Sequence, residues 1–240
     1  MRLRPISNGM KAVILAAGEG LRMRPLTESR PKPMIEILGK PLLHHIFDAL
    51  PDEIDEVILV TGYLEDHIKK YFGENFAGKK ISYVHQPKKL GTAQALWLVR
   101  PLLRDERFLM LYADDLQSKE DIQKCLAHPL SIMVKEVPDP RRFGVIVADD
   151  WGKVLDLVEK PISPPSNLAS TGVKVLDSKI FNYPAQQHSN GEYYITDSLS
   201  QMVRDYELIA VKADFWFPIG YPDDIKKAEE ILRARQIKEI

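Results

Sequence analysis

The sequence is short of the residues from which disulfide frameworks and cysteine metal sites are built. Its 240 residues include one cysteine, Cys125, so neither an internal disulfide nor a multi-cysteine metal site can form. Of the six histidines, His44 and His45 are the one adjacent pair, and neighbouring residues point to different faces of a helix. These absences argue against a disulfide-stabilised small domain and a histidine metal centre, and they favour a cytoplasmic location.

An excess of charge of one sign and long apolar runs are missing too. The 33 Lys and Arg residues are balanced by 34 Asp and Glu residues, whereas a general nucleic-acid-binding surface carries a basic excess. The apolar run at residues 12–17 is too short for the core of a signal peptide or for the roughly 20 residues of a membrane span. We therefore expect no nucleic-acid or membrane partner, and we interpret residues 1–9 as an N-terminal extension.

A regular alternation of strand and helix patterns occupies the first half of the chain. Short apolar runs predict buried strands at residues 11–18, 55–63, 80–86 and 107–115. Segments with helix boundary signals separate them, at residues 42–50, 64–73 and 92–103, with Thr92 as an expected N-cap. Such alternation predicts parallel strands joined by right-handed crossovers.

Beyond about residue 130 the pattern changes to strands with tight turns, and two more helices are expected at residues 195–205 and 223–236. No linker or internal repeat interrupts the chain. We predict an α/β fold with a mixed, mainly parallel central sheet. We expect a single domain over residues 10–240, with two lobes that divide near residue 130.

The stretch "LAAGEGLRMRPLTESRPKPM", residues 15–34, places a glycine turn and several cations directly after a predicted strand. Gly18 and Gly20 would let backbone N–H groups approach an anion closely, although two glycines alone also occur in ordinary turns. The loop lacks the G-K-[ST] of a Walker A loop, and the third glycine of the dinucleotide fingerprint would fall on Met23. Arg22 and Lys32 add positive charge, so the loop is interpreted as a phosphate-binding loop.

The same loop resembles the signature of sugar-1-phosphate nucleotidylyltransferases, which join a nucleoside triphosphate to a sugar 1-phosphate and release pyrophosphate. The sequence keeps the signature residues Gly18, Gly20, Arg22, Pro25, Thr27, Pro31 and Lys32. Leu21 stands where the family usually has threonine. Further segments similar to the family follow in its order: "QPKKLGTAQAL", "YADD", "RRFGVIV", "GKVLDLVEKP", "SNLASTGVKVLD", "GEYYITD" and "WFPIGYPDDI". The chain most resembles glucose-1-phosphate thymidylyl- and uridylyltransferases.

The resemblance implies a Rossmann-like three-layer sandwich of the nucleotide-diphospho-sugar transferase type. It implies a nucleotide-binding lobe at about residues 10–130 and a sugar-phosphate lobe at about residues 131–240. The implied catalytic residues are Arg22, Lys32 and Asp114. The implied nucleotide-binding residues are Leu15, Ala16, Ala17, Gly18, Glu19, Gly20, Gln86, Gly91 and Thr92. The amide of Gln86 can donate and accept in one plane, which suits the imide edge of uracil or thymine.

The second lobe would hold the sugar 1-phosphate. The resemblance implies contacts from Gly144, Glu159, Lys160, Thr171, Gly172 and Glu192. Because Glu159 and Lys160 are consecutive, we expect them to face opposite ways unless the strand is interrupted. Asp114 lies at the end of a predicted strand, at the sheet edge where parallel sheets place ligands. It would hold Mg²⁺ together with phosphates, and Asp223 is a further candidate ligand.

One departure from the family leaves the function open. In "WFPIG", Pro218 stands where the family usually has a second metal-binding aspartate, and proline has no carboxylate. The first hypothesis is transfer from UTP or dTTP to a sugar 1-phosphate with Mg²⁺. A mannose- or heptose-1-phosphate guanylyltransferase is one alternative, and a catalytically weak nucleotide-sugar sensor is another. Either a monomer or a homo-oligomer is compatible with the sequence.

Overall fold

The computed structural model describes residues 9–238, so the expected extension lies outside the described residues except for Gly9. Four parallel strands carry the first half of the chain: β1 (Met10–Leu15), β4 (Ile54–Thr61), β6 (Lys79–His85) and β7 (Phe108–Tyr112). β1 lies between β4 and β7, and β6 pairs with the outer side of β4. The short strand β5 (Asn75–Phe76) ends this side of the sheet in antiparallel pairing. The predicted parallel arrangement is confirmed.

The second half of the chain continues the same sheet. Its strands are β9 (Ser131–Glu136), β10 (Gly144–Ala148), β11 (Val154–Glu159), β12 (Leu168–Leu176) and β13 (Ile209–Lys212). β12 runs antiparallel to β7, with Lys174 opposite Met110 and Leu176 opposite Phe108. β12 also pairs with β9 and β10, and β10 pairs with β11. The described part of the chain thus forms one mixed sheet of ten strands.

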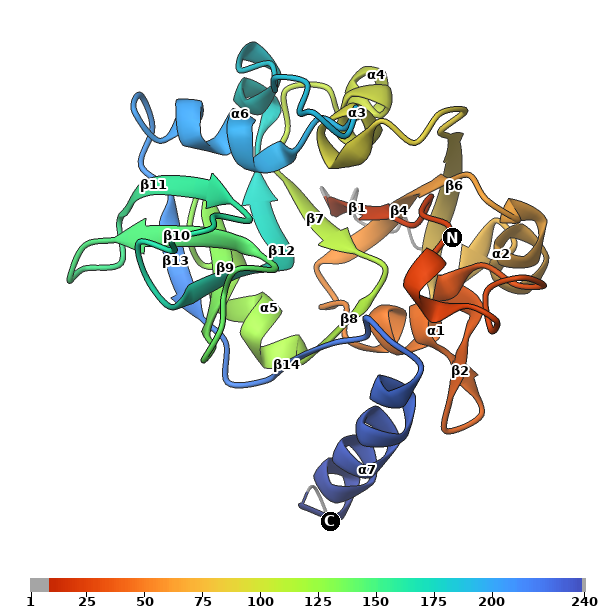
Figure 1. Ribbon diagram of the computed structural model, residues 1–240. Helices are drawn as coiled ribbons and strands as arrows, with labels where there is room; N and C mark the ends of the chain where they lie inside the picture. The colour runs from red at the N-terminus through yellow and green to blue at the C-terminus, as the bar shows by residue number, and fades with distance from the viewer. Residues whose placement is uncertain (1–8, 239–240) are drawn as a thin grey trace, which may run out of the picture.

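Alternate residues of the strands face two separate helical layers. On β1, Ala12 and Ile14 pack with α1 (Leu42–Asp48), α2 (Glu65–Phe72) and α5 (Lys119–Leu126). Val13 faces the other way, toward α3 (Gly91–Leu98), α4 (Arg100–Leu103) and α6 (Ile195–Met202). Figure 1 shows α3, α4 and α6 gathered above the sheet and α1 and α5 below it. The predicted three-layer sandwich is confirmed.

The helix expected at residues 92–103 differs from the structure. It begins at Gly91, with Leu90 as N-cap, and is divided into α3 and α4 at Val99, because Pro101 lacks the N–H that would continue the helix. Thr92 is not the N-cap. Its hydroxyl oxygen instead accepts the backbone N–H of Ile195 at 3.0 Å, which ties α3 to the start of α6.

Smaller elements complete the fold. β8 (Asp115–Gln117) pairs antiparallel with β14 (Trp216–Pro218), and β2 (Glu36–Ile37) pairs with β3 (Lys40–Pro41). Residues 9–238 also contain the short 3₁₀ turns η1 (Leu21–Met23), η2 (Lys32–Met34) and η3 (Ser178–Asn182). The last helix, α7 (Asp223–Lys238), follows β14 and lies at the bottom of the view in Figure 1. None of the described helices is long and apolar enough to cross a membrane.

Candidate active site

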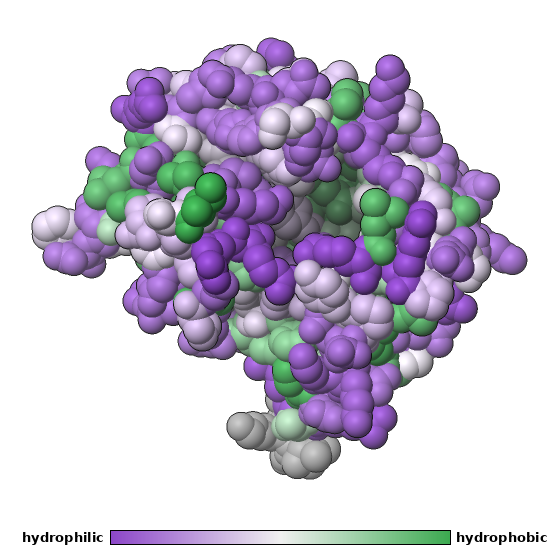
Figure 2. All heavy atoms as spheres, in the orientation of Figure 1, coloured by the Kyte–Doolittle hydropathy of each residue, from purple (hydrophilic) through white to green (hydrophobic). Residues whose placement is uncertain are grey.

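Two adjoining cavities open beside the carboxyl ends of the parallel strands, where such sheets place ligands. The first has a volume of about 550 Å³ and the second about 380 Å³. They share Arg22, Thr92, Tyr112 and Asp114 as lining residues. Figure 2 shows the same face hollowed near its centre, with hydrophilic residues around the hollow. Molecules bound in the two cavities would therefore meet at these four shared residues.

The first cavity brings together the whole set of residues expected to bind nucleotide. All nine of them line it: Leu15, Ala16, Ala17, Gly18, Glu19, Gly20, Gln86, Gly91 and Thr92. Arg22, Lys32 and Asp114 line it as well. The cavity therefore joins a glycine turn, two cations and a carboxylate, which suits a triphosphate ligand.

The glycine turn depends on the backbone freedom of Gly20. This residue has φ of 62°, and a Cβ atom there would lie 2.9 Å from the Cβ of Lys32. The hydroxyl of Thr27 donates a hydrogen bond to the Gly20 carbonyl at 3.0 Å and holds the turn closed. A side chain at position 20 would therefore both strain the turn and displace Lys32.

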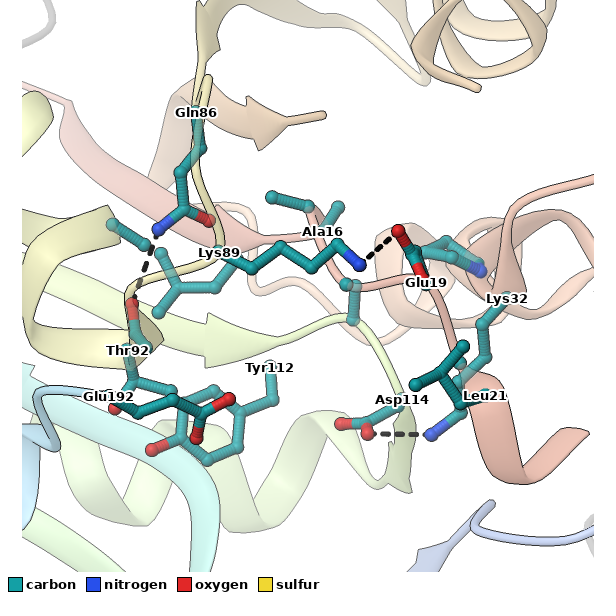
Figure 3. Close-up of a pocket in the computed structure, with 18 of the residues that line it drawn as sticks. Ala16, Glu19, Leu21, Lys32, Gln86, Lys89, Thr92, Tyr112, Asp114 and Glu192 are labelled. Carbon is teal, nitrogen blue, oxygen red and sulfur yellow. Dashed lines mark hydrogen bonds and ion pairs between the residues drawn. The ribbon is translucent and has the colours of Figure 1, made fainter. Parts of the chain in front are cut away.

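Lys32 and Asp114 meet on the floor of the first cavity, although 82 positions separate them in the chain. The ammonium of Lys32 donates a hydrogen bond of 2.6 Å to Asp114 Oδ2 (Figure 3). Lys32 is only 8 % exposed, whereas 41 % of the Asp114 side chain is accessible from the cavities. The pair thus sets a cation and an anion side by side at the junction of the two cavities.

A third cation of this cavity was not identified from the sequence. Lys89, from the "QPKKL" segment, forms an ion pair with Glu19 of the glycine turn (Figure 3). Glu19, expected to bind nucleotide, therefore has its carboxylate engaged by Lys89. The sequence shows two adjacent lysines at positions 88 and 89 that could contribute a cation, but only the fold shows that Lys89 lines the cavity.

The other end of the first cavity is formed by Gln86 and Gly91. The side-chain amide N–H of Gln86 donates to the Gln94 side-chain oxygen at 2.6 Å and to the Gly91 carbonyl at 3.3 Å. These bonds orient Gln86, and its own side-chain oxygen accepts no hydrogen bond from the described residues. That oxygen is available to a donor on a ligand, such as an imide N–H.

Gly91→Ala is expected to destabilise the protein by about 2–4 kcal/mol. Gly91 has φ of 90°, and a Cβ there would lie 2.4 Å from the Tyr193 carbonyl oxygen and 2.8 Å from the Tyr193 nitrogen. Gly73→Ala is the matched control, because Gly73 also has positive φ, 58°, but open space around the missing Cβ. Urea unfolding measures both variants, and equal losses in the two would contradict the close approach at Gly91.

The second cavity is lined by only part of the expected sugar-phosphate set. Gly144, Glu159 and Lys160 line it, together with Arg142 and Tyr221. Other expected residues lie elsewhere. Thr171 is 1 % exposed, and Gly172 donates its N–H to Asp115 Oδ2 at 3.0 Å, so both lie behind the cavity wall. Glu192 lines the first cavity instead of the second.

Glu159 and Lys160 lie on the same side of the chain, because the strand is interrupted at this point, the exception under which they were not expected to face opposite ways. β11 ends at Glu159, and Lys160 has φ of 42°, which turns its side chain back beside its neighbour. Lys160 Nζ lies 3.1 Å from Glu159 Oε1, while the Thr196 hydroxyl donates to Glu159 Oε2 at 2.6 Å. Burial disfavours the charge of Lys160, but Glu159 opposes this and the net effect raises its pKa.

A buried lysine next to Tyr112 was also missed. Lys174 is 1 % exposed, donates to the Thr171 carbonyl at 2.9 Å and lies 4.7 Å from the centre of the Tyr112 ring. Burial lowers its pKa to about 8. This lysine was visible in the apolar run "TGVKVLD", but the sequence did not show that it packs against Tyr112, which lines both cavities.

The donor set for a divalent metal is small. Asp114 offers an accessible carboxylate, while Asp115 is buried, and burial together with repulsion from Asp114 raises the pKa of Asp115 to about 7. Pro218 lies opposite Asp115 in the β8–β14 pair. No group of three His, Cys, Asp or Glu side chains suited to a metal occurs among residues 9–238. One carboxylate completed by phosphates and water is a donor set that Mg²⁺ accepts.

The structure does not bring Asp223 to this donor set. Asp223 is exposed at the first position of α7 and lines neither cavity. Its neighbour Asp224 lines the second cavity, but Asp224 Oδ2 accepts the N–H groups of Gly220 and Tyr221 at 2.9 and 2.8 Å. Asp224 therefore fixes the turn before α7.

Comparison with known proteins decides the family. Residues 11–235 match the family model described as nucleotidyl transferase. The chain belongs to the nucleotidyl transferase family. This confirms the family indicated by the sequence motifs and the enzyme class, a nucleotidyltransferase.

Curated relatives of this nucleotidyl transferase include two archaeal proteins. The UTP–glucose-1-phosphate uridylyltransferase AglF of Haloferax volcanii is 36 % identical over 236 residues, which cover 93 % of the present chain and 97 % of AglF. The bifunctional protein GlmU of Methanocaldococcus jannaschii is 37 % identical over 226 residues, again 93 % of the present chain. The chain spans about half of GlmU, 54 % of its length.

Solved structures agree with the fold. A UDP-glucose pyrophosphorylase in complex with UDP-glucose superposes with a TM-score of 0.83 at 25 % identity, covering 95 % of this nucleotidyl transferase and 99 % of that chain. A putative glucose-1-phosphate thymidylyltransferase from Bacillus anthracis gives a TM-score of 0.84 at 26 % identity, with coverage of 94 % and 96 %.

Proposed function

We propose that this nucleotidyl transferase moves a uridylyl or thymidylyl group from UTP or dTTP to a sugar 1-phosphate and releases pyrophosphate. The observation that carries the proposal is the pair of adjoining cavities that share Arg22 and Asp114. One cavity has the glycine turn and Gln86, and the other has Glu159 with Lys160. The named activities of AglF and of the two solved structures support the same class of substrates.

The proposed reaction is an in-line displacement at the α-phosphorus of the nucleotide. A phosphate oxygen of the sugar 1-phosphate forms a bond to this phosphorus while the bond to the bridging oxygen of the β-phosphate breaks. The attacking oxygen already carries negative charge, so no general base is needed, and positioning and charge neutralisation do the work. Arg22 would hold the β- and γ-phosphates, and Lys32 would neutralise the α-phosphoryl group.

A divalent metal fits this site, and we propose Mg²⁺. When bound, it would supply positive charge to the phosphates. Asp114 is the residue that would hold it, because its carboxylate lines both cavities and is accessible from them. The ammonium of Lys32 remains next to Asp114 and keeps its side chain oriented.

Gln86→Met is expected to raise KM for UTP about tenfold and to leave kcat nearly unchanged. The substitution removes a contact to the base that is equally strong in the bound substrate and in the transition state. Gln94 fixes the Gln86 side chain with its free oxygen available to the base. Gln123→Met, at an exposed position on α5, is the matched control. Steady-state kinetics measure the effect, and an unchanged KM in Gln86→Met would contradict the assigned contact.

Pro218 favours one alternative function, that of a nucleotide-sugar sensor with little catalysis. It lines the second cavity opposite Asp115 and offers no carboxylate to a metal. A sensor would bind a nucleotide sugar tightly and release no pyrophosphate.

A nucleotide panel tests these functions directly. Pyrophosphate release is measured with Mg²⁺ and with UTP, dTTP, GTP, CTP or ATP against several sugar 1-phosphates. Turnover with UTP or dTTP supports the proposal, whereas turnover confined to GTP indicates a guanylyltransferase. No pyrophosphate release with any nucleotide, combined with binding of UDP-glucose, indicates the sensor.

A further inference from the structure

Two arginines from distant parts of the chain share one aromatic ring at the mouth of the second cavity. The guanidinium carbon of Arg22 lies 5.2 Å from the centre of the Tyr221 ring, and that of Arg142 lies 4.9 Å from it. Arg22 comes from the loop after β1, and Arg142 precedes β10. Tyr221 follows β14, so the ring connects the loop of one cavity with the wall of the other.

These two arginines differ from the other cations of the cavity. Four cationic side chains line it, and the two lysines have carboxylate partners: Lys160 with Glu159 at 3.1 Å and Lys227 with Asp224 at 3.8 Å. Among the described residues, Arg22 and Arg142 have no hydrogen-bond or ion-pair partner, and both rest on the Tyr221 ring. Two unpaired guanidinium groups held near each other attract an anion that both can contact.

The neighbouring residue shows that Arg142 is placed differently from an ordinary surface arginine. Arg141 binds Asp139 through Nε and Nη2, both at 2.8 Å from the carboxylate oxygens. Arg142 makes no hydrogen bond or ion pair with this carboxylate among the described residues; its guanidinium lies over the ring of Tyr221 and lines the cavity. The two adjacent arginines therefore have separate partners, and a substitution of Arg141 can serve as the control for the same substitution of Arg142.

We infer that Arg142 binds the phosphoryl group of the sugar 1-phosphate, and that Tyr221 is a positioning residue that holds Arg142 beside Arg22. This inference rests on the proposed function, because it specifies how the second cavity receives its substrate. The phosphoryl group would lie between Arg142 and Lys160, next to the nucleotide phosphates contacted by Arg22. Binding of the sugar phosphate and the position of Arg22 are thereby linked through one ring.

Calorimetric titration of the full chain tests the assignment without requiring turnover. Glucose 1-phosphate, inorganic phosphate and UTP are each titrated into the wild type, Arg142→Met and Arg141→Met. Arg142→Met is expected to weaken glucose 1-phosphate and inorganic phosphate about tenfold or more relative to Arg141→Met, since it loses a charge-assisted contact. Its affinity for UTP should stay within about twofold of the control, because Arg142 does not line the first cavity.

Tyr221 is tested in the same way. Tyr221→Leu removes the ring under both arginines and is expected to weaken both glucose 1-phosphate and UTP, whereas Tyr221→Phe, which keeps the ring, should retain more affinity for each. Tyr206→Leu, at an exposed tyrosine outside both cavities, controls for loss of an aromatic side chain. Thermal unfolding of every variant separates lost binding from lost stability.

Several outcomes would overturn the inference. These are equal affinities in Arg142→Met and Arg141→Met, an equal loss of UTP affinity in Arg142→Met, or a wild type that binds neither phosphate probe. Failure of the proposed function gives a different result. In that case, binding still depends on Arg142, but the wild type releases no pyrophosphate from any nucleotide.

Discussion

Lys32→Met is expected to lower kcat about 100- to 1,000-fold, with a much smaller change in KM. The ammonium is held 2.6 Å from Asp114 and is largely excluded from solvent. A cation fixed in this way stabilises charge that develops in the transition state without reorganising, and loss of one such group costs about 3–4 kcal/mol of barrier. Methionine keeps much of the side-chain volume, so the loss isolates the charge.

The control for this prediction lies in the same loop. Arg30→Met also removes a positive charge, but Arg30 is exposed and 3.6 Å from Glu36, outside both cavities. Single-turnover measurement of pyrophosphate release compares the two variants at saturating substrates. Similar rates in Lys32→Met and Arg30→Met would show that the loop contributes only general positive charge.

Asp114→Asn is expected to reduce activity about 1,000-fold and to raise the Mg²⁺ concentration needed for half-maximal rate. Asparagine keeps the shape of the side chain but removes the negative charge, which weakens a hard cation site and the pairing with Lys32. Asp114 is the one carboxylate lining both cavities, so we expect no other side chain in residues 9–238 to replace it fully.

Asp223→Asn is the matched control, since it removes the other acid considered as a metal ligand from an exposed position at the start of α7. Magnesium titrations of the initial rate are compared for the two variants. A larger shift in the Asp223 variant would place the metal near α7 and contradict the assignment to Asp114.

The sequence predicted best what local patterning determines. The glycine turn after β1 and the alternation of strand and helix follow from residues close together in the chain, and all nine expected nucleotide-binding residues line one cavity. Gln86 and Gly91 were expected because the segment "QPKKLGTAQAL" resembles the family, and both lie near the end of a predicted strand and the start of a predicted helix. The carboxyl ends of parallel strands then bring these segments to one edge.

Contacts between distant segments could not be read in the same way. Lys89 meets Glu19, and Arg142 meets Tyr221, only because loops from separate strands converge. The sequence also contains no signal for the left-handed backbone at Lys160. Positive φ is uncommon for lysine, and the position carries neither glycine nor asparagine, the residues that favour it. The burial of Thr171 was not predicted either; this residue lies where the pairing of β12 with β9 is irregular.

The pairing of β12 with β7 constrains how substrates enter and products leave. Backbone hydrogen bonds join residues 174–176 to residues 108–110 of β7, the strand that ends at Tyr112 beside the two cavities. A hinge at this point would break a central ladder of the sheet and expose apolar side chains on both faces, at a cost far above that of loop movement. The two halves of the chain are therefore not expected to rotate apart as rigid bodies about this pairing. Movement that admits a ligand is therefore left to surface segments that line the cavities, namely the glycine turn, the Lys89 segment and the Tyr221 turn.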